Sequence, residues 1–220
     1  MGVVIYRRRR VLLAIGLVAP ILAFVSVGLA ALLYPGFNNA TQYISDLGGP
    51  KAQHPELFNG AILITGLGAF AAGAGFALAV VALGGSWTAA GLTALSFGLA
   101  GVGMTLASYY HWPDPRHLAI NLALGIQIAP LTLLWGLARA EGMAGLRRFL
   151  IAVFVVMAIL TVLTKHLLWP GLVNDANVGW WERAFAIVLV GWIAVAALAL
   201  ERRLVFLASR IGSAEGPVTD

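Results

Sequence analysis

The side chains of this chain that could carry chemistry are concentrated in three short segments. The first is YISDLGGPKAQHPELFNG at 43–60, the second is HWPDPRHLAIN at 111–121, and the third is KHLLWPGLVNDANVGWWERAF at 165–185. All four histidines of the chain lie in these segments. The candidate residues are Ser45, Asp46, His54, Glu56, Asn59, His111, Asp114, Arg116, His117, Asn121, Lys165, His166, Glu182 and Arg183.

One chemistry that these residues allow is acid–base catalysis. A carboxylate such as Asp46 and an imidazole such as His117, placed at a bilayer interface, would have pKa values suited to proton transfer. A lipid hydrolase or transferase acting on the outer leaflet could use this pair. A zinc ion could assist it, with ligands from His54, His111, His117 and His166, but no His-x-x-x-His or His-Glu-x-x-His pair is present. We therefore predict no cofactor and keep the metal-dependent enzyme as an alternative.

The favoured interpretation is a lipid-binding or membrane-organising protein. Arg116, Lys51 and Arg183 could meet a lipid phosphate, while Ser45 and Asn59 could donate hydrogen bonds to a headgroup. Membrane lipids are then the expected partners, and the sequence gives no indication of oligomeric state.

Several candidates also suit purely structural roles. Asp114 before Pro115 has the pattern of an N-cap followed by proline in the first helical turn, and Glu182 suits the start of a helix. Lys165 can extend to the lipid headgroups. Deeper in the membrane, Gln127 with the nearby Pro130 could line a cavity, or its amide could form an interhelical hydrogen bond.

The composition places these segments on a membrane scaffold. Hydrophobic residues make up 60% of the 220 residues, and the mean hydropathy is +0.90. A helix needs about 20 apolar residues to cross a bilayer, and six such runs are present, at 11–34, 57–83, 87–110, 118–137, 149–168 and 183–200. The fold class predicted is an all-α membrane protein, with residues 1–220 forming a single six-helix transmembrane domain.

Basic residues predict the orientation of these helices. Ten of the 14 lysines and arginines fall at one side of a six-helix layout, in the N-terminal segment, near residues 139–148 and near residues 202–210. By the positive-inside rule both termini are cytoplasmic and the three polar segments face outward. We expect a multi-pass protein of the inner (plasma) membrane whose first helix is not cleaved. The sequence pI of about 10.1 then reflects topology, and no nucleic-acid partner is expected.

Short motifs link the chain to known families. The order of YISDLGG, HPELFNGAILITG and a later loop ending in His117 resembles the prokaryotic membrane family called domain of unknown function 998, which has a Ser-x-Leu-Gly-like element, a Phe-Asn start to helix two and a histidine opening helix four. A second resemblance is to the Frag1/DRAM/Sfk1 six-helix group, which is associated with lipid remodelling, although GPKAQ interrupts the spacing. Its matching positions are Ile44, Ser45, Asp46, Gly48, Pro55, Glu56 and Phe58.

The first polar segment is too polar to enter lipid by itself, yet Ile44 and Leu47 suit a packed position. We expect it to fold back as a lid over the bundle. Because a buried unpaired charge is costly, we expect Asp46 to face the start of the fourth helix, where Arg116 or His117 would neutralise it.

Overall fold

The protein is a bundle of helices in the computed structural model, which describes residues 2–164 and 169–214. It is 78% helical and has no strand in that part of the chain. The predicted all-α fold class is confirmed. The α-helices are α1 (Gly2–Leu32), α2 (Pro55–Ala82), α3 (Trp87–Tyr109), α4 (Ala129–Gly136), α5 (Ala144–Thr164) and α6 (Val178–Ala214). A short 3₁₀ helix, η1 (Ile44–Gly48), lies between α1 and α2, and a longer one, η2 (Pro115–Gln127), directly precedes α4.

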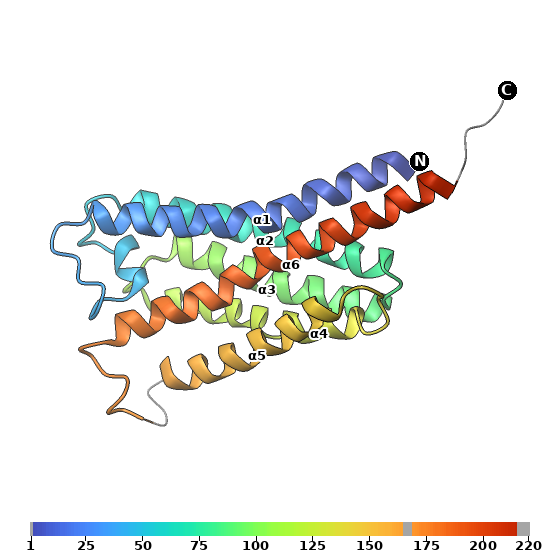
Figure 1. Ribbon diagram of the computed structural model, residues 1–220. Coiled ribbons are helices and arrows are strands. Elements are labelled where there is room, and N and C mark those ends of the chain that lie inside the picture. The colour runs from blue at the N-terminus through green and yellow to red at the C-terminus, as the bar shows by residue number, and fades with distance from the viewer. Residues whose placement is uncertain (1, 165–168, 215–220) are drawn as a thin grey trace.

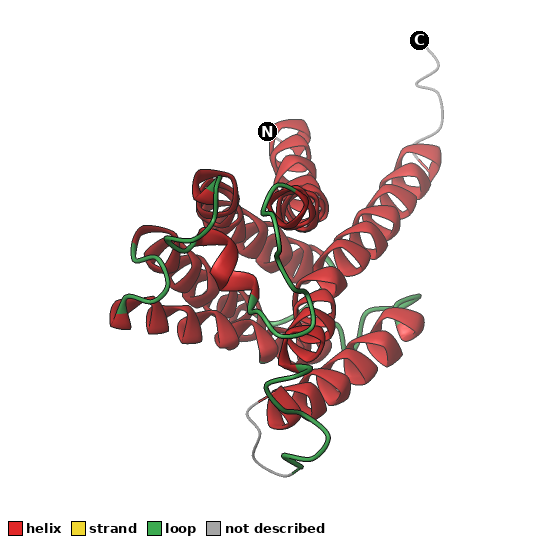
Figure 2. Ribbon diagram, turned by 90° about the vertical axis from the view of Figure 1, so that its left-hand side faces the viewer, coloured by secondary structure: helices red, strands yellow, loops and turns green. Residues whose placement is uncertain are grey.

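Six segments of the described chain are long and apolar enough to cross a membrane. They pack in sequence order, and α6 closes the ring against α1, so the first and last helices lie side by side (Figure 1, Figure 2). The centre holds an aromatic cluster in which Phe76 stacks on Phe97 with ring centroids 5.0 Å apart and Trp192 contacts both rings. Small residues allow neighbouring helices to pack closely. A Cβ on Gly75 of α2, for example, would lie 2.8 Å from the backbone of Leu12 in α1.

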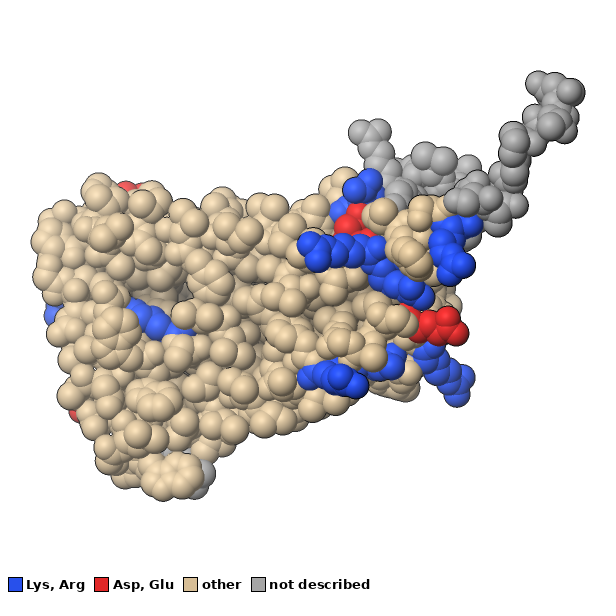
Figure 3. Space-filling view, viewed as in Figure 1, with Lys and Arg blue, Asp and Glu red and all other residues tan. Residues whose placement is uncertain are grey.

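Arginines gather at the end of the bundle where both termini lie (Figure 1, Figure 3). We call this the basic end; it comprises residues 2–10, 137–148 and 201–214. The opposite end, which we call the loop-1 end, comprises residues 33–54 (loop 1), 110–114 and 169–177. The clustering of basic residues on one side of the layout is therefore present in three dimensions, whereas the cytoplasmic location of the basic end stays a prediction.

The fourth span differs from the regular helix predicted at 118–137. Its first 13 residues form the 3₁₀ helix η2, and α-helical winding begins only at Ala129, beside Pro130, which has no backbone N–H to donate. A 3₁₀ helix has three residues per turn, and the inward positions follow that period: His117, Ala123 and Ile126 are buried and Ile120 is half-buried. The tighter winding rises about 2.0 Å per residue against about 1.5 Å in an α-helix, which lengthens the span.

Three other predicted helices also differ in their bounds. The first helix, predicted at 11–34, begins earlier, at Gly2, and ends at Leu32. The last helix, predicted at 183–200, runs from Val178 to Ala214, because a helix does not have to end where its apolar run ends. The fifth helix, predicted at 149–168, begins earlier at Ala144 and is described to Thr164; residues 165–168 lie outside the described residues.

The predicted orientation can be tested by cysteine labelling, since the chain contains no cysteine of its own. Cysteines at Ala52 and Ala176, at the loop-1 end, should react with a membrane-impermeant thiol reagent added to intact cells. A cysteine at Ala144, which is exposed at the basic end, should react only after the cells are opened. The reverse pattern would place the basic end outside.

Candidate functional site

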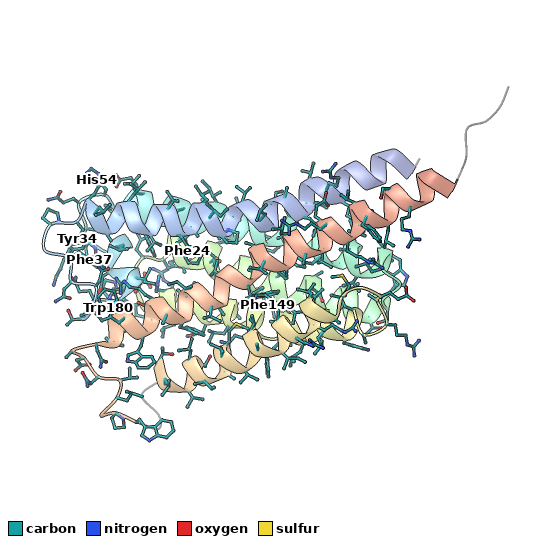
Figure 4. All side chains as sticks on the ribbon, viewed as in Figure 1. Phe24, Tyr34, Phe37, His54, Phe149 and Trp180 are labelled. Carbon is teal, nitrogen blue, oxygen red and sulfur yellow. The ribbon has the colours of Figure 1, made fainter. Side chains whose placement is uncertain are left out.

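Loop 1 folds back onto the bundle and docks on the first turns of α6. The Gly179 N–H donates to the Ala40 carbonyl at 2.7 Å. The Arg183 guanidinium donates to the Asn39 side-chain oxygen at 3.0 Å and to the Gln42 carbonyl at 3.0 Å. It also lies 5.3 Å from the centre of the Phe37 ring, and Figure 4 shows Phe37 at the same end of the bundle as Trp180. The expectation that loop 1 folds back onto the bundle is therefore confirmed.

The carboxylates of this region gather around Tyr43. Glu182 accepts a hydrogen bond from the Ile44 N–H, which fixes the start of η1 to α6. Burial raises the pKa of the Tyr43 hydroxyl, and the negative charges of Glu182, Asp175 and Asp46 raise it further.

The partner predicted for Asp46 is wrong. Its carboxylate accepts a hydrogen bond from the Tyr43 N–H at 2.9 Å and so closes the first turn of η1, where Ser45 lies half-buried. Among the described residues no ion pair joins Asp46 to Arg116 or His117. A short carboxylate reaches its own backbone with little loss of freedom, and this local bond competes with a distant partner.

Arg116 is instead held by its neighbours in sequence. It contacts the Asp114 carboxylate through two side-chain nitrogens, at 3.0 and 2.7 Å, and it lies 4.1 Å from the centre of the Tyr110 ring. The Arg116 guanidinium lowers the pKa of Asp114 to about 2. Asp114 also accepts the Arg116 N–H as the N-cap of η2, so its structural role is confirmed.

His117 and Asn121, both candidate residues, do not share a face of η2. Residues four apart in a 3₁₀ helix differ by about 120°, so His117 is buried whereas Asn121 is exposed. The Nδ1 of His117 lies 2.7 Å from the Tyr110 carbonyl. A carbonyl only accepts, so in the neutral ring Nδ1 carries the proton and Nε2 keeps the lone pair.

The remaining candidates divide between structural contacts and exposed positions. Gln127 accepts a hydrogen bond from the Thr161 hydroxyl at 2.9 Å, which is the interhelical bond that was one of its two predicted roles. His54 pairs with Glu56 at 3.1 Å on the surface, and His111 is exposed. Lys165 and His166 lie outside the described residues. Within the described residues, no three His, Cys, Asp or Glu side chains gather as they would around a metal ion.

An open groove of about 980 Å³ lies at the loop-1 end, between the first turns of α2 and the last turns of α3. Loop 1 and the segment between α3 and η2 border its outer part. Buried Asn59 fixes this border by donating to the Gly48 carbonyl at 3.0 Å. The residues that line it include Glu56, Asn59, Gly60, Leu63, Thr105, Leu106, Ser108, Tyr110 and His111.

The sequence analysis identified Glu182 and Arg183, which dock loop 1, but it missed their partners in the loop and most of the residues that line the groove. Asn39 and Gly179 act in the docking contact, and the carbonyls of Ala40 and Gln42 act with them. Backbone groups carry no residue-type signal, so the sequence could not reveal them. Thr105 is a small residue in an apolar helix, so its residue type gave no indication of a role in the groove.

A model of a protein family matches residues 17–199, described as Protein of unknown function (DUF998). The chain belongs to the DUF998 family. This membership confirms the first resemblance noted from the motifs, and the comparisons give no support for the second, to the Frag1/DRAM/Sfk1 group. Comparison with curated proteins and with solved structures found no match. Family and fold together identify a multi-pass membrane protein of the DUF998 family.

Proposed function

We propose that this protein binds a membrane lipid in the groove between α2 and α3 at the loop-1 end. The groove is polar at its outer edge and apolar deeper in. Glu56 and His111 lie at its outer edge, whereas Leu63 and Leu106 lie deeper and are themselves partly exposed. From Pro55 to Leu63 it follows α2 for about 12 Å at about 1.5 Å per residue. This depth suits a headgroup together with the upper part of an acyl chain.

The observation that carries the proposal is the hydroxyl of Thr105. This oxygen is buried beside the groove without a hydrogen-bond partner among the described atoms. An unsatisfied polar group at membrane depth is costly. The oxygen faces Gly66 of α2, 3.0 Å from where a Cβ would stand, and rotation of the side chain toward the groove would let a headgroup or ester oxygen satisfy it. The nearby Asn59 amide and Ser108 hydroxyl are already bonded to backbone carbonyls.

The lining also indicates which headgroups fit. The described residues that line the groove include no lysine or arginine. Arg116 lies at its edge, where it contacts the lining residues Asp114 and Tyr110, whereas Arg183 is bonded to loop 1. Glu56 and the hydroxyl groups favour a headgroup that donates hydrogen bonds, such as an amine or a polyol. The alternative of a hydrolase or transferase using Asp46 and His117 gains no geometric support, since the two side chains bond to separate partners.

A groove-filling variant tests the proposal. A Cβ at Gly60 would meet no atom within 4 Å, and Gly60 lines the groove, so Gly60→Leu extends an apolar side chain into it. We expect phosphatidylethanolamine, titrated onto the delipidated protein and followed by native mass spectrometry, to bind about tenfold more weakly, a loss of about 1.4 kcal/mol. Thr105→Val should weaken binding severalfold because it removes one hydrogen bond.

The matched control is Gly28→Leu. Gly28 is an exposed residue of α1 near the loop-1 end, and a Cβ there would likewise meet no atom within 4 Å. Gly28 lies outside the groove. The Gly28→Leu variant should therefore bind lipid as the unaltered protein does. Unchanged binding in a folded Gly60→Leu variant would refute the proposal.

A further inference from the structure

A second groove lies at the other end of the molecule, between α1 and α6. It encloses about 360 Å³. Its walls are apolar along most of their length, and an ion pair between Arg10 and Glu201 stands at its polar mouth. The lining residues are Arg10, Val11, Leu13, Ala14, Leu17, Ala197, Leu198 and Glu201.

The surroundings of this groove are strongly basic. At the basic end the described side chains include eight arginines, Arg9, Arg10, Arg139, Arg147, Arg148, Arg202, Arg203 and Arg210, against two acids, Glu141 and Glu201. Figure 3 shows the blue side chains gathered around this end. Charge complementarity therefore favours an anionic occupant. The described lining of the groove at the loop-1 end holds no arginine or lysine, so it offers no comparable attraction for an anionic lipid.

Arg10 links the charged surface to the apolar walls. Its side chain is 54% exposed although its Nε bonds to Glu201. A guanidinium has five N–H donors and can serve a carboxylate and a phosphate together. Ala14, one helical turn deeper, is exposed and lines the groove below Arg10.

We propose that this groove is a binding site for an anionic glycerophospholipid from the leaflet at the basic end. One acyl chain lies between α1 and α6 along Ala14 and Leu198, and the phosphate contacts Arg10. The lipid then bridges the first and last helices where the ring of the bundle closes. This site is separate from the groove at the loop-1 end, and it does not depend on the function proposed for that groove.

The sharpest test separates Arg10 itself from the general charge of this end. The double variant Arg10→Gln/Glu201→Gln leaves the net charge unchanged and keeps a hydrogen-bonding pair. We expect it to bind phosphatidylglycerol about fivefold more weakly than the unaltered protein does, measured by native mass spectrometry of the full chain in detergent. Ala14→Leu should abolish one saturable phosphatidylglycerol site.

The chain offers matched controls on α5. Arg148 and Ala152 are both exposed, have the same four-residue spacing as Arg10 and Ala14, and lie outside the groove. Arg148→Gln removes a net positive charge yet should change the affinity less than twofold, and Ala152→Leu should keep the saturable site. Phosphatidylcholine and inorganic phosphate should not compete for it.

Several results would overturn the proposal. One is a double variant that binds normally while Arg148→Gln binds weakly, because binding would then follow net charge alone. Another is competition by inorganic phosphate, which would indicate an ion site without an acyl chain. A third is a dimer that dissociates in Ala14→Leu, since the occupant would then be a second copy of the protein.

Discussion

Replacing Gly179 with alanine should lower the free energy of unfolding by about 2–3 kcal/mol, because it overpacks the contact between loop 1 and α6. An alanine Cβ would lie 2.5 Å from the Asn39 carbonyl oxygen and 2.6 Å from that of Gln42. Both neighbours are backbone atoms, so the whole loop must move. The movement would also stretch the hydrogen bond from the Gly179 N–H to Ala40. Thermal unfolding in detergent, followed by the circular dichroism of the helices, measures the effect.

Gly191 provides the control for this variant. It lies in the same helix, and a Cβ there would meet no atom within 4 Å. Gly191→Ala should leave the stability unchanged or raise it slightly, since alanine favours the helix. Equal melting temperatures for the two variants would show that loop 1 is not tightly docked.

The second large effect is expected for Arg183→Met, which keeps most of the side-chain volume but removes its donors. The variant loses the hydrogen bonds to Asn39 and Gln42 and a third to the Gly179 carbonyl at 2.8 Å. We expect a loss of about 2–4 kcal/mol, because three hydrogen bonds are lost together and their partly buried acceptors lose this donor. Guanidinium hydrogen bonds are also stronger than neutral ones.

A double-mutant cycle localises this loss. Combining Arg183→Met with Asn39→Ala should reveal a coupling of about 1 kcal/mol, because the two side chains share a hydrogen bond. Arg116→Met is the comparison at the same end of the bundle. Its pair with Asp114 is exposed to solvent, so its effect on stability should be far smaller. If both arginine variants lost the same stability, the docking of loop 1 would not depend on Arg183.

The sequence by itself determined the number of membrane spans, their order and the gathering of arginines at one end. These features follow from local composition, because a bilayer requires about 20 apolar residues in succession whatever surrounds them. The N-cap at Asp114 was predictable for the same reason, since cap, proline and helix are neighbours in the chain.

Only the tertiary structure decided which groups meet. Asp46 bonds to its own turn, whereas Glu182 and Arg183 hold loop 1. That contact joins residues about 140 positions apart. It also depends partly on backbone carbonyls, which every residue has and which the sequence therefore does not distinguish. The winding of η2 likewise separates His117 from Asn121. Apolar runs fix where a chain crosses the membrane, but contacts between distant segments depend on the packing of all the helices together, and that packing shapes both grooves.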